Sequence, residues 1–269
     1  MDDSRCKMDR PEWCGTHPTT GEVYFTMTNN ASRSVARVDA ANPRSYVDPL
    51  FDGVARTGSN ATPRNWNGQI VRLREDGNAA ATGFFWDVYL FGAEADAGPM
   101  VNLSSLTDDQ DFSSPDGLWF SRTTGICWIQ TDDGAYTDET NCMMLAALPG
   151  TVGDGAVTTV TNTATDGTTA SVNTYVGKKP SAATLKRFLV GPVDCEITGA
   201  TETADGRTLF INVQHPGEAR VSPASLLAEP ANFVSHWPGN AGYGAGGADA
   251  RPRSATIVIT KNDGGRIGS

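Results

Sequence analysis

Short stretches of apolar, aromatic and β-branched residues recur along the chain, and clusters rich in glycine and proline separate them. Several stretches alternate apolar and polar positions with a period of two, as in ATIVIT near the C-terminal end. Such stretches between turn residues predict β-strands. The predicted strands cover residues 22–28, 69–74, 84–91, 118–121, 126–131, 143–148, 156–161, 170–175, 185–190, 196–198, 208–213 and 255–260.

Helical periodicity is nearly absent from the chain. The best candidate for a helix is the short stretch at residues 223–227. A chain with many short strands and almost no helix belongs to the all-β class, so we expect an all-β fold.

A weak internal repeat narrows this expectation. The segments HPTTGEVYF (17–25), SPDGLWF (114–120) and TADGRTLF (203–210) each place a polar turn with glycine before an aromatic or aliphatic strand. A repeated turn-and-strand unit is typical of β-propellers, whose blades have four strands each. About a dozen strands would form about three blades, which is fewer than a closed propeller needs. The pattern therefore favours a partial β-propeller, with a β-sandwich as the alternative.

Three segments between the predicted strands differ in composition. Residues 42–66 and 237–253 are rich in glycine and polar residues and predict long loops, which often carry function. Residues 151–169 form a Thr/Gly/Asp stretch that is predicted to be an inserted, exposed hairpin.

Composition and charge exclude several classes of function. The chain has 269 residues, of which 39% are hydrophobic and 19% charged, as in a globular protein. Its net charge of -10 would be repelled by a phosphate backbone, so nucleic acid is not an expected partner. No apolar run is long enough to span a membrane, and the polar start MDDSRCKMDRPEW does not resemble a secretory signal. Five scattered cysteines predict neither a zinc site nor a disulfide framework.

Candidate chemistry lies in carboxylates near turns. No serine-hydrolase elbow, nucleotide-binding loop or zinc-protease motif is present, and three histidines are too few for a site built on clustered histidine. Oxygen-rich sites suit hard cations such as Ca²⁺. An aspartate before a glycine, such as Asp133 or Asp205, is usually only a turn residue. The carboxylates beside turns are Asp9, Glu12, Asp111, Asp116, Asp132, Asp133, Asp194 and Glu196.

Glu12 and Glu196 stand out because each lies next to an apolar strand. A carboxylate buried there must bind a metal or form an ion pair, since burying it alone costs several kcal/mol. Candidate ion-pair partners are Arg10 and Arg187. The residues alone leave the two interpretations open.

The order of motifs along the chain resembles the PhoX-type alkaline phosphatases. The motifs include DRPEW, SPDGLWF, CEITG and QHPGE, and the resemblance extends from about Lys7 to Gly268. It is a resemblance to the C-terminal half of that family, whose members are six-bladed propellers that hydrolyse phosphate monoesters with calcium and iron. The resemblance therefore implies that residues 1–269 form about three of six blades, with an insertion near residues 150–170.

The resemblance also implies roles for matching residues. Glu12 looks like a metal-ligating carboxylate, and Arg10 like the arginine that faces the phosphate. Asp116 and Glu196 look like further metal ligands. The implied cofactors are Ca²⁺ and Fe³⁺, and the implied substrate is a phosphate monoester.

Two further residues lie in family motifs near the channel. Asn30 of TNN and His215 of QHPG are candidate substrate-binding residues, and packing beside Pro216 is the alternative role for His215.

The resemblance leaves out the family's N-terminal half, which supplies an iron-ligating cysteine and another carboxylate. We therefore expect an incomplete site, and either self-association or pairing with that half through an exposed edge. The family is exported to the periplasm or secreted, while this chain shows no signal peptide. The alternatives are a non-catalytic calcium-binding propeller fragment and a calcium-dependent propeller hydrolase such as a lactonase.

Overall fold

The computed structural model describes residues 8–48, 50–51, 54–55, 61–78, 80–133, 139–218, 229, 232–243 and 246–269. These residues form an all-β structure with short 3₁₀ turns at Val35–Arg37 (η1), Gly239–Ala241 (η4) and Gly247–Asp249 (η5). The strands are β1 (Pro11–Thr16), β2 (Val23–Met27), β3 (Leu50–Phe51), β4 (Val54–Ala55), β5 (Gln69–Glu75), β6 (Phe84–Phe91), β7 (Pro115–Phe120), β8 (Cys127–Thr131), β9 (Met143–Ala147), β10 (Ala156–Thr163), β11 (Thr169–Val176), β12 (Leu185–Val190), β13 (Glu196–Glu202), β14 (Thr208–Gln214) and β15 (Ala255–Thr260).

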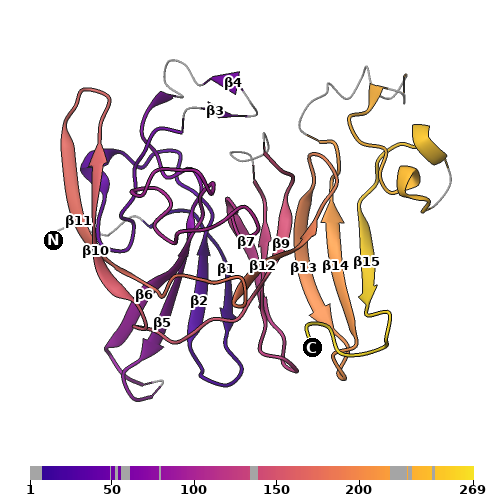
Figure 1. Cartoon of the computed structure of the whole chain (residues 1–269), viewed down its shortest axis with the longest axis horizontal. Coiled ribbons are helices and arrows are strands. Elements are labelled where there is room, and N and C mark those ends of the chain that lie inside the picture. The colour runs from indigo at the N-terminus through magenta and orange to yellow at the C-terminus, as the bar shows by residue number, and fades with distance from the viewer. Residues whose placement is uncertain are drawn as a thin grey trace.

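The strands form three larger sheets (Figure 1), and the hairpin β10–β11 of the first sheet lies in the sequence between β9 and β12 of the second. The first sheet has the order β1-β2-β5-β6-β11-β10, in which the first four strands run antiparallel. The second sheet has the order β12-β9-β8-β7, and the third has the order β13-β14-β15. Strands β3 and β4 form a separate two-stranded pair.

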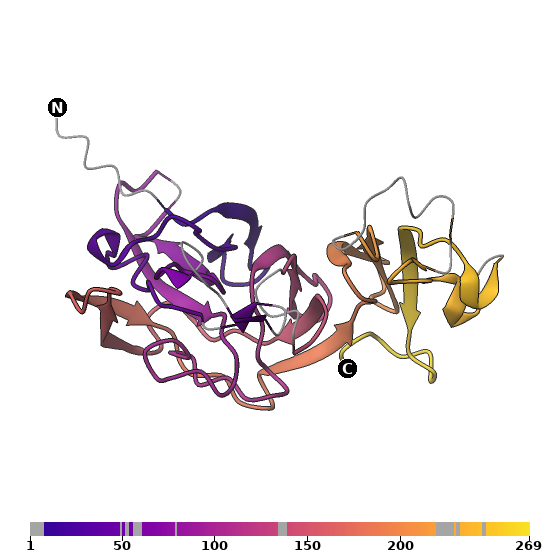
Figure 2. The same cartoon turned by 90° about the horizontal axis from the view of Figure 1, so that it is seen from above.

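The three sheets meet along their first strands. Strand β1 lies against β7, and β7 lies against β13. Buried residues between the first and second sheets include Tyr24, Ile70 and Leu118, and those between the second and third include Trp128 and Ile197. Seen from above, the sheets succeed each other from the N-terminal to the C-terminal side (Figure 2). In the described residues none of the sheets closes on itself, so the partial propeller stays a prediction.

The sequence pattern located most strands correctly. Strands β6, β12 and β15 have the predicted bounds, and β15 shows the expected alternation of half-buried and exposed residues. The pattern missed β1, whose sequence PEWCGT has no alternation and whose residues are mostly exposed. The predicted helix at 223–227 lies outside the described residues.

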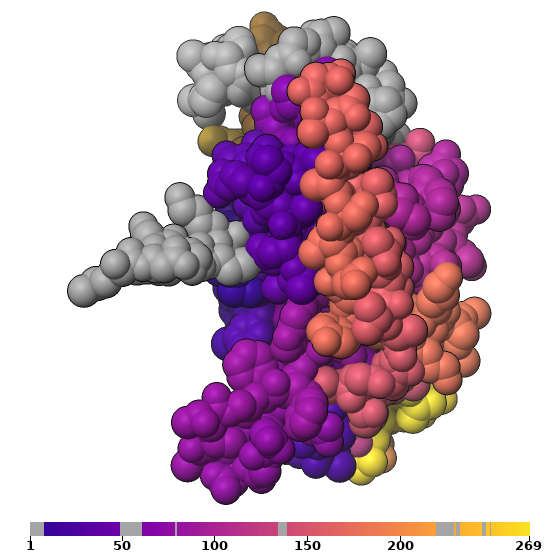
Figure 3. Space-filling model, turned by 90° about the vertical axis from the view of Figure 1, so that its left-hand side faces the viewer, coloured from indigo at the N-terminus to yellow at the C-terminus, as the bar shows by residue number. Residues whose placement is uncertain are grey.

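The segment predicted to be an exposed hairpin forms β10 and β11. The pair joins the first sheet through a parallel bridge between Val176 and Val88 and extends along its side (Figure 3). Its base is held by the buried Arg72, whose guanidinium donates to Asp87 at 2.7 and 3.0 Å and to Asp154 at 2.6 Å. The interpretation of this hairpin as an insertion stays a prediction.

Two other features of the described residues bear on the sequence expectations. Cys14, Cys127, Cys142 and Cys195 are free thiols. No helix among the described residues is long and apolar enough to cross a membrane.

Candidate functional site

The three carboxylates singled out in the sequence occupy matching positions in the three sheets. Glu12 is the second residue of β1, Asp116 the second residue of β7, and Glu196 the first residue of β13. Because β7 lies against both β1 and β13, the fold brings three distant chain segments together.

Each of these first strands carries an irregularity in its pairing. The register shifts between Pro11 and Cys14 in β1 and between Pro115 and Leu118 in β7, so Glu12 and Asp116 both lie inside a bulge. In β13 the shift follows Thr198. Bulges bend a strand and redirect side chains, and they are common next to active sites. They explain how a charged residue can leave the regular alternation of its strand.

The pKa of Asp116 shows that the carboxylates lie close enough together for their charges to interact. Its pKa is raised to about 7, first by burial and then by the negative charges of Glu12, Glu196 and Asp132, while Arg10 opposes the shift. Like charges close together disfavour ionisation. The residues expected to form a site are therefore near enough to act on each other, and Asp132 joins them from the end of β8.

Glu196 is the carboxylate with a histidine partner. Its Oε2 atom lies 3.5 Å from Nε2 of His215, and Nδ1 of His215 lies 3.0 Å from Glu218. Burial and then the negative charge of Asp132 raise the pKa of Glu196, and His215 opposes this. His215 has a φ of 37°, a strained conformation that is frequent at functional sites. Its position beside Glu196 places His215 next to the carboxylates of Glu12, Asp116, Asp132 and Glu196.

Glu12 is paired with Arg10, one of the two arginines considered from the sequence. Nε of Arg10 lies 2.7 Å from Oε1 of Glu12, and half of the arginine side chain is exposed. Arg187, the other candidate, is instead paired with Asp111. The pairing of Glu12 does not exclude a cation, because a carboxylate has two oxygens and several acceptor positions.

The segment before Glu12 is anchored by a buried ion pair. Asp9 is fully buried, and its Oδ1 accepts a hydrogen bond from Nε of Arg33 at 2.9 Å and lies 2.8 Å from Nη2 of the same guanidinium. Its Oδ2 accepts one from Asn65 at 2.7 Å. The backbone of Arg10 then pairs with that of Asn29 and Thr28. Asp9, a turn carboxylate in the sequence, therefore holds Arg10 and Glu12 in place.

Asn30 lies near this anchor, and its side chain is engaged locally. Its Oδ1 accepts a hydrogen bond from the backbone N–H of Ser32 at 2.8 Å, and its own N–H donates to the carbonyl of Asn65. A role of Asn30 in substrate binding stays a prediction.

Glu12, Asp116, Asp132 and Glu196 form a cluster, here called the four-carboxylate cluster. Its oxygens are the donors that hard cations prefer, and a cation would relieve the repulsion that raises the pKa of Asp116. Within the described part of the chain, no three His, Cys, Asp or Glu side chains already converge as a complete ligand set. The oxygen donors fit a hard cation, whereas these side chains alone do not form a complete coordination shell.

Asp132 was among the carboxylates beside turns, but no role in the site was assigned to it from the sequence. In QTDDG it has the composition of a turn, and only its place at the end of β8, next to β7, brings it to Asp116. The only sequence signal for Asp132 was its position directly after the apolar strand CWIQT.

The charge of this group predicts how stability depends on pH without metal. Because the pKa of Asp116 is about 7 in the folded state and about 3.9 in an unfolded chain, the folded state binds the proton more tightly. The stabilisation of the folded state by protonated Asp116 is fully present at low pH and is lost as the pH rises from about 4 to about 7. We expect the melting temperature of the metal-free protein to fall over this interval relative to that of Asp116→Asn. A difference between the two proteins that does not change with pH would contradict this prediction.

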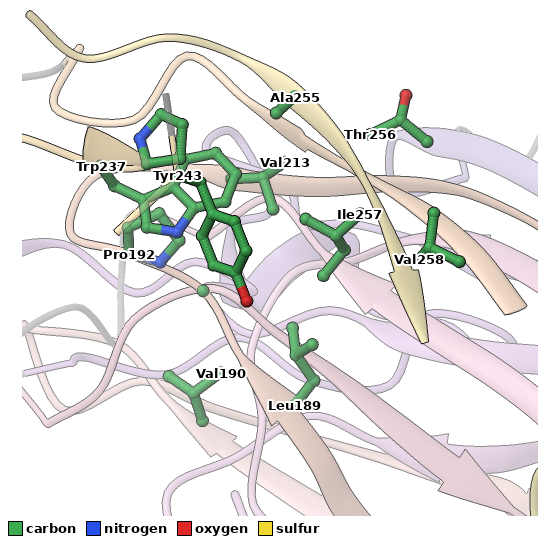
Figure 4. A pocket seen from close by; sticks show the side chains of 12 residues that line it. Leu189, Val190, Pro192, Val213, Trp237, Tyr243, Ala255, Thr256, Ile257 and Val258 are labelled. Atoms are coloured by element: carbon green, nitrogen blue, oxygen red, sulfur yellow. The ribbon is translucent and has the colours of Figure 1, made fainter. Parts of the chain in front are cut away.

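A separate cavity of about 540 Å³ lies between the second and third sheets at their outer strands (Figure 4). It is lined mainly by apolar side chains of β12 and β15, together with Trp237 and Tyr243. Among the described residues that line it there is no carboxylate, histidine or basic residue, in contrast to the four-carboxylate cluster.

Comparisons with known proteins show which family the chain resembles. A solved structure of Pseudomonas fluorescens PhoX in complex with vanadate, a transition state analogue, is similar to 97% of this chain, with a TM-score of 0.61 and 30% sequence identity. The alignment covers 35% of the PhoX chain. No curated protein matches the chain. The family model for alkaline phosphatase PhoX matches residues 3–217, which include all six candidate residues, whereas the expected resemblance extends to about Gly268. The chain belongs to the PhoX family of alkaline phosphatases.

Proposed function

We propose that this chain supplies the calcium-binding and phosphate-facing part of a metal-dependent phosphomonoesterase site. The observation that supports the proposal most is the group of Glu12, Asp116, Asp132 and Glu196, which three neighbouring sheets bring close enough for their charges to raise the pKa of Asp116. Four carboxylates beside one arginine form a site for cations and a phosphate together.

Arg10 is the residue proposed to bind the phosphate. Its ion pair with Glu12 would orient the guanidinium, and the exposed half of the side chain can reach a ligand. A guanidinium binds two phosphate oxygens in parallel, whereas a lysine ammonium acts as a point charge. Phosphoryl transfer depends mainly on positioning and charge stabilisation, so these residues need no serine nucleophile.

Calcium is proposed to lie among Glu12, Asp116, Asp132 and Glu196, and iron is proposed as the second metal of the family. Bound cations would supply positive charge for the phosphate oxygens. His215, in contact with Glu196 and Glu218, would keep the Glu196 carboxylate oriented. A ligand set with one open position would leave room for the substrate.

The three sheets are proposed to be consecutive blades of a propeller, with β1, β7 and β13 as the strands nearest the channel. The adjacency of these three strands supports this arrangement. Because the chain corresponds to 35% of the solved PhoX chain, we propose that further residues of a PhoX-like protein complete the ligand set. Pairing through an open sheet edge, and a location outside the cytoplasm, are parts of the same proposal.

The proposal is tested by calcium titration and by hydrolysis of p-nitrophenyl phosphate with added calcium and iron. The chain is assayed alone and mixed with the part of Pseudomonas fluorescens PhoX that the alignment does not cover. We expect calcium binding by the chain itself and turnover in the mixture. Absence of calcium binding would overturn the proposed metal site. Calcium binding without turnover in the mixture would favour a non-catalytic calcium-binding domain.

A further inference from the structure

The bulges that carry Glu12 and Asp116 are each opposed by one buried polar residue. In the first sheet Thr26 of β2 lies between the pairs Pro11↔Met27 and Cys14↔Phe25, so it faces the bulge with Glu12. In the second sheet Gln130 of β8 lies between Pro115↔Thr131 and Leu118↔Ile129, so it faces the bulge with Asp116. Thr26 and Gln130 are 0% and 1% exposed. They occupy the same structural position in consecutive sheets.

Both side chains reach out of their own sheet to the next one. The hydroxyl of Thr26 accepts a hydrogen bond from the N–H of Trp13 at 2.9 Å and donates to the carbonyl of Asp116 at 2.7 Å. It therefore joins the neighbour of Glu12 directly to Asp116. Nearby, the hydroxyl of Thr28 donates to the carbonyl of Pro115 at 3.0 Å and supports the same junction.

Gln130 makes the corresponding link from the second sheet to the third. Its Nε2 donates to the carbonyl of Gly199 at 3.0 Å, three residues after Glu196. A Cβ atom on Gly117 would lie 2.5 Å from Oε1 of Gln130, so glycine is needed beside Asp116 for the amide to fit. A buried side chain that replaced the amide with an apolar group would leave the Gly199 carbonyl without this donor.

We infer that Thr26 and Gln130 are positioning residues that hold the three carboxylate-bearing strand beginnings at fixed spacing. Thr26 sets Asp116 against Glu12, and Gln130 sets Glu196 against Asp116. The consequence for metal binding rests on the proposed function, because the spacing of the carboxylates decides whether they can share a cation. The coupling between the strands does not depend on a metal.

The test compares Thr26→Val and Gln130→Met, which keep the shape of the side chain and remove the hydrogen bonds. Amide hydrogen exchange of the metal-free protein is followed by peptide, together with calcium affinity. With Thr26→Val we expect amide exchange about tenfold faster in residues 11–16 and 115–120, and no change in residues 196–202. The loss of a buried hydrogen-bond partner destabilises the neighbouring backbone by about the free energy that corresponds to a tenfold change. With Gln130→Met we expect the increase in 196–202 and none in 11–16. Calcium affinity should fall about tenfold in each.

Two further variants serve as controls. Thr174→Val removes a buried threonine hydroxyl that donates to the carbonyl of Ala40 at 2.6 Å, within the first sheet and its loops. It should lower stability to a similar extent without changing exchange in β1, β7 or β13 or the calcium affinity. Thr26→Ser keeps the hydroxyl and should behave as the unmodified protein does, which guards against a Thr26→Val variant that fails to fold.

The outcomes separate this inference from the proposed function. Exchange that rises evenly over the three strands, or only as much as in Thr174→Val, would overturn the positioning role. If the unmodified chain binds no calcium, the proposed metal site fails, while the segment-specific exchange pattern still decides whether Thr26 and Gln130 couple the strands.

Discussion

Replacing Glu12 by glutamine is expected to lower calcium affinity at least about a hundredfold. Removing even an outer hydrogen-bond partner of a metal ligand typically costs 10- to 100-fold in affinity, and Glu12 is proposed as a ligand itself. Glutamine keeps the size of the side chain and loses its charge, which is one of the main determinants of calcium affinity. Turnover in the reconstituted assay should be lost with calcium binding.

The fold should tolerate this change, so that the loss can be assigned to the site. The pair of Arg10 with Glu12 is partly exposed, with 51% and 32% of the two side chains accessible, and such pairs contribute at most about 1 kcal/mol. Isothermal titration with calcium and thermal melting would be measured on the same preparations. Glu75→Gln, at the exposed end of β5, is the matched control and should leave both unchanged. Calcium binding by Glu12→Gln as tight as in the unmodified protein would remove Glu12 from the metal site.

Much of the strand content could be predicted from the sequence, because alternation and turn residues are local signals. Residues 255–260 alternate in sequence and form the half-buried edge strand β15. The strand β1 could not be predicted in this way. It begins with Pro11, has Gly15 in its interior and is mostly exposed, so neither apolar alternation nor a continuous apolar run marks it.

Most residues of the candidate site could be predicted from the sequence, but their arrangement in space could be predicted only in part. Glu12 and Asp116 each follow a proline at the beginning of a strand, which made them visible as carboxylates beside turns. Their common position inside bulges depends on which residues oppose them in β2 and β8, and no local pattern contains that information. For the same reason Asp132 could not be distinguished from an ordinary turn residue. The ion-pair partners were also a matter of tertiary structure, since Arg10 and Arg187 were equally plausible from the sequence, and Arg187 pairs with Asp111.

The buried pair of Asp9 and Arg33 shows why the position of Arg10 and Glu12 depends on residues that never touch a ligand. Asp9 is 0% exposed and Arg33 is 2% exposed, and two nitrogens of the guanidinium contact the same carboxylate. A buried pair of this kind contributes little compared with an apolar replacement of both partners, whereas removing one partner leaves an uncompensated charge. The stability of the segment before Glu12 therefore depends on both residues being present.

Replacing Arg33 by methionine is accordingly expected to lower the free energy of unfolding by about 3–5 kcal/mol. The carboxylate of Asp9 would retain Asn65 as a donor at 2.7 Å, but it would remain buried beside a neutral side chain. Urea unfolding should show a lower midpoint with an unchanged slope, because the surface exposed on unfolding is nearly the same.

Two comparisons make this expectation specific to the buried pair. Arg207→Met breaks a contact between Arg207 and Asp205, whose two side chains are 63% and 62% accessible, and should leave stability almost unchanged. The double variant Arg33→Met/Asp9→Leu removes both charges and should be more stable than Arg33→Met alone, since no unpaired carboxylate remains. If the double variant is instead less stable than the single one by the full cost of a second substitution, the two residues contribute independently, and the loss in Arg33→Met comes from its other contacts, such as the hydrogen bond to the carbonyl of Arg37. In that case Asp9 would not be the residue that fixes the beginning of β1.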